Sequence, residues 1–225
     1  MARNVDLVDY SRQRELDSRL VGIKDTTHFI LGCGGIGYWL GIQLAMLGAS
    51  NFVLVDGDKL EASNLNRLPV PQTWIGHNKA LALSNMIHFL RPLCTVTVIQ
   101  QHASVENIGL FLGVAGDLAS RLHHSLNTWD CTDNARIQKV IYKAAKDVSY
   151  YTKLGYEGME VGCYNNFNIW IDEATYQPGY RTSNANAVTS SIAAGLGIFY
   201  RGLGLAQDNN INLETLVRGN YVQRE

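Results

Sequence analysis

The stretch HFILGCGGIG, residues 28–37, decides the fold. An apolar run, His28-Phe29-Ile30-Leu31, passes directly into a glycine-rich turn, and apolar residues at helical spacing follow from Tyr38 to Leu47. We therefore predict a buried strand, a tight turn and a helix. Such a turn presents backbone N–H groups at a helix N-terminus, where anions such as phosphate are favoured.

The glycines of this turn fit the pattern G-x-G-x-x-G through Gly32, Gly34 and Gly37, with Gly35 inside it. In this pattern the first glycine allows the tight turn, the second lets a phosphate approach the backbone, and the third lets helix and strand pack closely. Asp56 ends the next apolar run, where a carboxylate can accept hydrogen bonds from ribose hydroxyls. These residues predict an adenine-nucleotide site that would suit NAD as well as ATP.

Outward from this unit, strand-like and helix-like segments alternate. This order predicts an α/β fold: a Rossmann-like, doubly wound and mostly parallel sheet. The segments are a strand at Asn51–Val55, a helix at Lys79–Leu90, a strand at Thr95–Ile99, one short helix within 103–126, and a helix at Ala135–Lys146.

The pattern changes after about residue 150. Residues 156–172 suggest two short strands, which would form a short antiparallel extension, 173–187 a crossover loop, and 188–206 an apolar helix rich in small residues. We expect a helical arm over 1–20 and one domain over 21–225, whose C-terminal part, 151–225, would face the molecule on which the domain acts.

Composition excludes several classes of function. A net charge of −1 gives no general attraction to nucleic acid or anionic lipid. No apolar run approaches the ~20 residues of a membrane span, and the polar start lacks a signal peptide, so we expect a cytoplasmic protein. The four cysteines, Cys33, Cys94, Cys131 and Cys163, form no CxxC pair, so we expect no zinc.

Three charged residues further along the chain favour ATP over NAD. A hydride-transfer site has no need of an arginine and a lysine beside the phosphates, whereas adenylation does. When a carboxylate attacks the α-phosphate, negative charge grows on the phosphoryl oxygens and on the departing pyrophosphate, and Arg, Lys and Mg²⁺ stabilise it. Arg67 and Lys79 would supply the cationic groups, and Asp133, after a strand, is suited to hold the metal.

Together these stretches resemble the ubiquitin-activating-enzyme-like superfamily, and within it the adenylyltransferases that activate sulfur-carrier proteins for molybdopterin and thiamine synthesis. The matching stretches are Tyr10-Ser11-Arg12-Gln13, GCGGIG at 32–37, DGDKLEASNLNR at 56–67, Lys79 and DCTDN at 130–134.

The resemblance implies a role for each matching residue. Asp56 would bind ribose, Asn64, Arg67 and Lys79 would bind the ATP phosphates, and Asp133 would hold Mg²⁺. Arg12 is similar to the family arginine that reaches the phosphates from a neighbouring subunit, which implies a homodimer.

The resemblance also implies an acceptor, the Gly-Gly tail of a ubiquitin-like or sulfur-carrier protein, or in specialised members a peptide or RNA-linked carboxylate. Two alternatives remain: a catalytically silent partner subunit of an activating enzyme, and an NAD-dependent oxidoreductase. The expected crossover loop contains no cysteine, and Cys163 just before it is the nearest candidate nucleophile. We read Cys163 as a packing residue, because nothing beside it indicates a depressed pKa.

Overall fold

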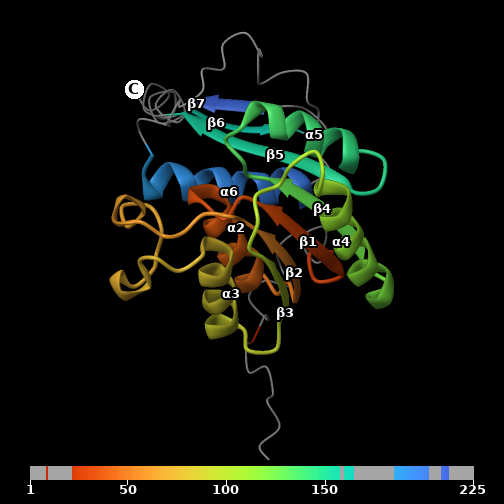
Figure 1. Ribbon diagram of the computed structural model, residues 1–225, viewed down its shortest axis with the longest axis horizontal. Helices are drawn as coiled ribbons and strands as arrows, with labels where there is room; N and C mark the ends of the chain where they lie inside the picture. The colour runs from red at the N-terminus through yellow and green to blue at the C-terminus, as the bar shows by residue number, and fades with distance from the viewer. Residues whose placement is uncertain (1–8, 10–21, 158–159, 165–184, 203–208, 213–225) are drawn as a thin grey trace, which may run out of the picture.

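A single twisted sheet runs through the part of the chain that the computed structural model describes: Asp9 and residues 22–157, 160–164, 185–202 and 209–212. Within these residues the sheet has seven strands in the order β3-β2-β1-β4-β5-β6-β7 (Figure 1). The strands are β1 (Thr26–Leu31), β2 (Asn51–Val55), β3 (Thr95–Ile99), β4 (Ser125–Asp130), β5 (Tyr150–Glu157), β6 (Glu160–Tyr164) and β7 (Asn209–Asn212).

The first five strands are parallel, and β6 and β7 add to the sheet antiparallel. The strand order reverses between β1 and β4, which is where open α/β sheets form a ligand crevice at the carboxyl ends of the strands. Leu31 pairs with Val55 on one side and with Asp130 on the other. The turns that follow β1, β2 and β4 therefore leave the sheet side by side.

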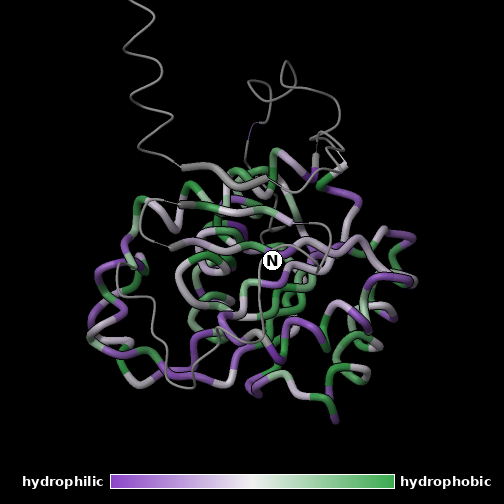
Figure 2. The backbone as a smooth tube through the Cα atoms, turned by 90° about the horizontal axis from the view of Figure 1, so that it is seen from above, coloured by the Kyte–Doolittle hydropathy of each residue, from purple (hydrophilic) through white to green (hydrophobic). Residues whose placement is uncertain are grey.

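Helices cover both faces of the sheet. They are α2 (Gly35–Met46), α3 (Lys79–Leu90), α4 (Ile108–Leu122), α5 (Ala135–Ala145) and α6 (Ala187–Gly202), with short 3₁₀ turns η2 (Ala62–Asn64) and η3 (Gln72–Trp74). Side chains of α2, α3 and α6 form one core cluster with the sheet, and those of α4 and α5 form the other. In Figure 2 hydrophobic residues gather near the centre of the molecule, and much of the chain at the periphery is hydrophilic. None of the described helices is long and apolar enough to cross a bilayer.

His28 shows how polar residues are accommodated in the fully buried strand β1. Its Nδ1 accepts a hydrogen bond from Trp129 Nε1 at 3.1 Å, and its Nε2 donates to the Ile23 carbonyl oxygen at 3.1 Å. Burial lowers the pKa of His28 from 6.5 to about 4. The ring is therefore a neutral structural connector between β1 and β4.

The predicted α/β fold is confirmed, including the antiparallel addition after the parallel strands. Two details of the sequence prediction are wrong. The helix within 103–126 is not short, because α4 has 15 residues, and the strand expected after residue 156 already begins at Tyr150. The expected arm over 1–20 apart from Asp9, and most of the crossover loop, lie outside the described residues.

Candidate nucleotide-binding site

The glycine loop between β1 and α2 has the backbone that the sequence pattern predicts. Gly32 has φ +86°, and a Cβ atom there would lie 2.9 Å from the Cys131 carbonyl oxygen. A Cβ atom on Gly37 would lie 1.9 Å from the Gly32 carbonyl oxygen, so only glycine allows the first turn of α2 to pack on the loop. Around Gly34 there is open space, with no atom within 4 Å of a built Cβ.

The N-terminus of α2 lies beside this open space at Gly34. Among the described residues no side chain caps the helix at Gly34, and its first turn holds no acidic residue. Backbone N–H groups and the helix dipole at such an end attract an anion. This end of α2 is therefore suited to a phosphate group.

Asp56, at the end of β2, joins the glycine loop to the neighbouring strand. Its Oδ2 accepts a hydrogen bond from the Cys33 N–H at 2.7 Å, and its Oδ1 accepts one from the Asp58 N–H at 2.8 Å. Burial is the main cause that raises the pKa of this carboxyl group. Each oxygen keeps a second lone pair, so Asp56 braces the loop and can still accept a ribose hydroxyl, the role the sequence predicts.

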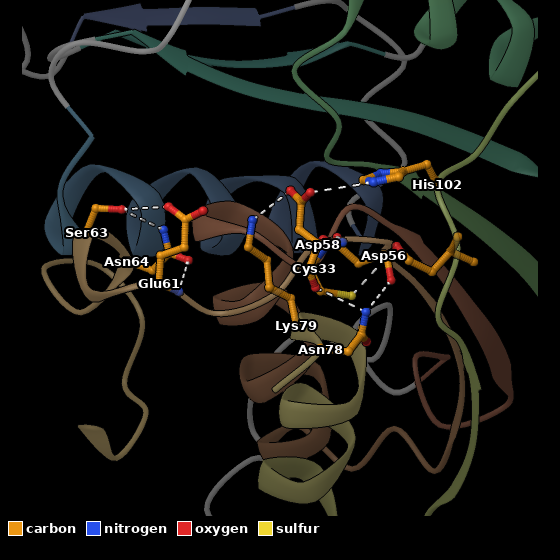
Figure 3. Close-up of polar contacts among 10 residues, drawn as sticks. Cys33, Asp56, Asp58, Glu61, Ser63, Asn64, Asn78, Lys79 and His102 are labelled. Atoms are coloured by element: carbon orange, nitrogen blue, oxygen red, sulfur yellow. Dashed lines mark hydrogen bonds and ion pairs between the residues drawn. The ribbon is translucent and has the colours of Figure 1, made fainter. Parts of the chain in front are cut away.

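Lys79 opens α3 beside Asp56 and is held by Asp58, as Figure 3 shows. Its Nζ lies 2.8 Å from Asp58 Oδ2, while Asp58 Oδ1 lies 3.6 Å from His102 Nε2. The Lys79 side chain is only 14% exposed. Asp58 therefore holds the ammonium group at the mouth of the site.

Asn64 and Arg67 lie on the loop after β2, on the other flank of the α2 N-terminus. Asn64 is buried, and its Oδ1 accepts a hydrogen bond from the Glu61 N–H at 3.1 Å, closing a capping box around η2 (Figure 3). Arg67 Nη1 donates to the Ser63 carbonyl oxygen at 2.8 Å and to Asn66 Oδ1 at 3.0 Å. The Arg67 Cδ lies 3.4 Å from a Cβ built on Gly35, so its stem lies against the first residue of α2.

Asp133 lies in the turn between β4 and α5. It is exposed, and none of the described residues forms a hydrogen bond or ion pair with it. The next residue, Asn134, caps α5 by accepting hydrogen bonds from the N–H groups of Arg136 and Ile137. The turn itself packs on the glycine loop, since the Cys131 carbonyl oxygen is the nearest neighbour of the Cβ built on Gly32. The Asp133 carboxylate is therefore free for a ligand at the crevice.

Sequence reasoning missed the buried polar residues behind this turn. Asp130 is fully buried and contacts Tyr151 and Lys153 of β5. One feature of the sequence could have indicated them: Lys153 follows Tyr151 by two residues in a strand, and this spacing places both side chains on one face of β5. It also missed Ser190 of α6 and Tyr156 of β5, whose oxygens lie 2.7 Å and 3.3 Å from the Cβ built on Gly35.

The cysteines in the described residues form no disulfide with one another and are mostly buried. Burial raises the pKa of the Cys33 thiol, and it raises that of Cys131 to about 12. Cys163 is 4% exposed, in the middle of β6. In these surroundings the thiols pack as small hydrophobic groups. The described residues hold no cluster of three His, Cys, Asp or Glu side chains able to bind a metal.

The fold and the site together identify the class of protein. The chain belongs to the ThiF family, because the sequence pattern of that family matches residues 10–193. The tRNA threonylcarbamoyladenosine dehydratase of Haemophilus influenzae is 35% identical over 79 residues, which is 35% of this chain and 30% of that protein. Ubiquitin-like modifier-activating enzyme 5 of Drosophila ananassae is 26% identical over 153 residues, which is 65% of this chain and 39% of that protein.

Solved structures show the same fold. That of the Escherichia coli tRNA N6-threonylcarbamoyladenosine dehydratase has a TM-score of 0.67 and 17% identity, covering 89% of this chain and 96% of the other. The Escherichia coli MccB structure with ATP has a TM-score of 0.60 and 18% identity, covering 87% of this chain and 66% of the other.

Of the predicted site residues, the structure brings the four glycines, Asp56, Asn64, Arg67, Lys79 and Asp133 to the carboxyl end of the sheet. Asn64 and Asp56 already accept hydrogen bonds from the local backbone, whereas Asp133 has no partner within the part of the chain that the structure describes. Arg12 lies outside the described residues. The ligand roles of all these residues stay predictions.

Proposed function

We propose that this chain binds ATP with Mg²⁺ and transfers its adenylyl group to a carboxylate of an acceptor, releasing pyrophosphate. The observation that carries the proposal is the arrangement at one edge of the sheet. An uncapped helix N-terminus stands there between a lysine, the stem of an arginine and a turn with a free aspartate. Membership of the ThiF family, and the ATP bound in the similar MccB structure, support the choice of ATP.

The reaction balances without a further reactant. A carboxylate oxygen of the acceptor attacks the α-phosphorus of ATP, forming a P–O bond. The bond from the α-phosphorus to the oxygen that bridges to the β-phosphate breaks, and its electron pair leaves with pyrophosphate. The product is an acyl-adenylate. Charge builds up on the phosphoryl oxygens and on the leaving group, so fixed cations at these positions lower the barrier.

The side chains divide this work. The N–H groups at the start of α2 would receive a phosphate, and Asp56 would accept a ribose hydroxyl. Lys79 would exchange its exposed partner Asp58 for phosphate oxygens when ATP binds, since an ion pair with a surface carboxylate is weak. Arg67 would reach the phosphates by turning its guanidinium away from Ser63 and Asn66, and Asn64 would hold this loop in place.

The donor set fits Mg²⁺. Mg²⁺ keeps several waters and is bound by one or two carboxylates together with substrate phosphates, so a single free Asp133 beside the phosphate site is sufficient. When bound, the ion would neutralise developing charge on the phosphate oxygens. The role of Asp133 is to hold it at the carboxyl end of β4.

For the acceptor we propose the Gly-Gly tail of a ubiquitin-like or sulfur-carrier protein. The similarity to ubiquitin-like modifier-activating enzyme 5 supports this choice, and a flexible glycine tail could reach an α-phosphate enclosed by side chains. A peptide or an RNA-linked carboxylate is the second candidate, supported by the similarity to MccB and to the tRNA dehydratase. Arg12 from a second copy would complete the phosphate site, so we infer a homodimer. We also propose that it acts in the cytoplasm.

The test is acceptor-dependent exchange of labelled pyrophosphate into ATP. The acceptor is a small ubiquitin-like protein ending in Gly-Gly, and its control is the same protein without the two glycines. We expect exchange with the first protein only, and its loss with Asp133→Ala. Exchange with neither protein, in a chain that binds MgATP, would contradict the Gly-Gly acceptor.

A further inference from the structure

Asp130 carries a fully buried carboxylate just before the turn that presents Asp133. Its Oδ2 accepts a hydrogen bond from the Tyr151 hydroxyl at 2.9 Å. Its Oδ1 accepts bonds from the Thr132 N–H at 3.0 Å and the Thr132 hydroxyl at 2.7 Å. The only charged group near this oxygen among the described residues is Lys153, with its Nζ at 3.7 Å.

Lys153 does more than neutralise Asp130. Its side chain is 7% exposed, and its Nζ also donates to the carbonyl oxygens of Asp130, at 3.4 Å, and of Thr132. Two of the three N–H donors of the ammonium group thus bind backbone carbonyl oxygens of one turn, and its charge faces Asp130 Oδ1 at 3.7 Å. Gln138 Nε2 of α5 donates to the same Thr132 carbonyl oxygen at 2.7 Å. The backbone beyond β4 is therefore anchored from both β5 and α5.

The anchored turn is shared by two parts of the nucleotide site. On one side the Cys131 N–H donates to the Leu31 carbonyl oxygen at 2.9 Å, and the Cys131 carbonyl oxygen lies against Gly32. On the other side the Thr132 carbonyl group directly precedes Asp133. A displacement of the Thr132 carbonyl oxygen would therefore move both the glycine loop and Asp133.

A buried ion pair is a costly way to gain stability. Replacing such a pair by apolar residues of similar size is often neutral or stabilising, whereas removing one partner alone costs several kcal/mol. Stability by itself therefore gives no reason for a lysine here. The two carbonyl contacts give one, because an apolar side chain could not hold these backbone groups.

We propose that Lys153 is a positioning residue of the nucleotide site, which holds the turn 130–133 so that Asp133 meets the metal of a metal–ATP complex. This inference rests on the proposed function of the site. Partners that orient a metal ligand without touching the metal typically contribute about 10- to 100-fold to metal affinity. Lys153 would act in this way through the backbone.

The test compares Lys153→Met with the double variant Asp130→Asn/Lys153→Met. The double variant leaves no unpaired buried charge, so it stays folded even where the single one fails, but it still lacks the carbonyl contacts. Lys146→Met is the matched control, since Lys146 is an exposed lysine paired with Asp147. Gln138→Leu removes the other donor to Thr132 without changing any charge.

Two affinities are measured. Electron paramagnetic resonance gives the affinity for Mn²⁺ in the presence of ATP, and calorimetry in EDTA gives the affinity for ATP without a metal ion. We expect Mn²⁺ binding to weaken about tenfold or more in the double variant and less in Gln138→Leu, and to stay within about twofold in Lys146→Met. A folded double variant that binds Mn²⁺ as tightly as wild type would overturn the inference. Absence of ATP binding by the wild-type chain would instead contradict the proposed function.

Discussion

Replacing Gly37 by alanine tests whether the glycine loop and α2 are packed as described. The added Cβ would lie 1.9 Å from the Gly32 carbonyl oxygen, where real Cβ contacts are essentially never under 3.0 Å, so backbone must shift by about 1 Å. Overpacking costs ~1–3 kcal/mol, and this contact with backbone belongs at the upper end. Alanine in place of a glycine within a helix stabilises the folded state by about 1 kcal/mol. We expect a net loss of about 2 kcal/mol in unfolding free energy.

Two other glycines provide controls. Gly113 lies in α4, exposed and with nothing within 4 Å of a built Cβ, so Gly113→Ala should stabilise by about 1 kcal/mol. Gly34 is equally open but faces the proposed phosphate, so Gly34→Ala should keep the stability and weaken MgATP binding. Urea unfolding followed by circular dichroism measures the stability of Gly37→Ala and Gly113→Ala, and calorimetry measures MgATP binding by Gly34→Ala. A Gly37→Ala variant that unfolds at the wild-type urea midpoint, with an unchanged slope, would refute the packing argument.

The remaining predictions concern the chemistry and the pH dependence. Lys79→Ala and Arg67→Ala should each lower the rate of pyrophosphate exchange by ~10²–10³-fold, as loss of one fixed charge-stabilising group does. Cys163→Ala should leave the rate unchanged. Loss of exchange in Cys163→Ala, with exchange retained in Lys79→Ala and Arg67→Ala, would contradict the assigned roles. Because burial lowers the pKa of His28 to about 4, the unfolded chain takes up this proton first as the pH falls. The His28 contribution to stability is therefore full above pH 6.5 and falls by about 3 kcal/mol towards pH 4. In urea unfolding, His28→Gln should show a flatter dependence between pH 7 and 4.5, and an unchanged slope with pH would exclude this role.

The sequence was most informative where local pattern and tertiary environment agree. The strands at 51–55 and 95–99 and the helix at 79–90 have the predicted bounds. The glycine turn was predictable because few other residues permit its backbone. Helix α4 was underestimated because Gly109, Gly113 and Gly116 lower helix propensity, whereas the apolar face from Ile108 to Ala119 packs on the sheet and outweighs that loss.

The buried anchor of the site could not be predicted in the same way. A lysine in a strand usually indicates a solvated position, whereas Lys153 is buried beside Asp130, its register partner on the neighbouring strand β4. For Asn64, by contrast, the sequence predicted a functional contact and missed a structural one. Its place in a matching stretch predicted a ligand contact, and the structure adds a local role in capping η2, which spacing alone did not reveal.

The preference of the site for a nucleotide tests the central claim most directly. We predict that ATP with Mg²⁺, at about 100 times its dissociation constant, stabilises the chain by about 2.7 kcal/mol, which raises the melting temperature by roughly 5–10 °C for a domain of this size. NAD at the same concentration should not change it, and Asp133→Ala should reduce the part of the shift that depends on Mg²⁺. A clear rise with NAD and none with MgATP would contradict the account.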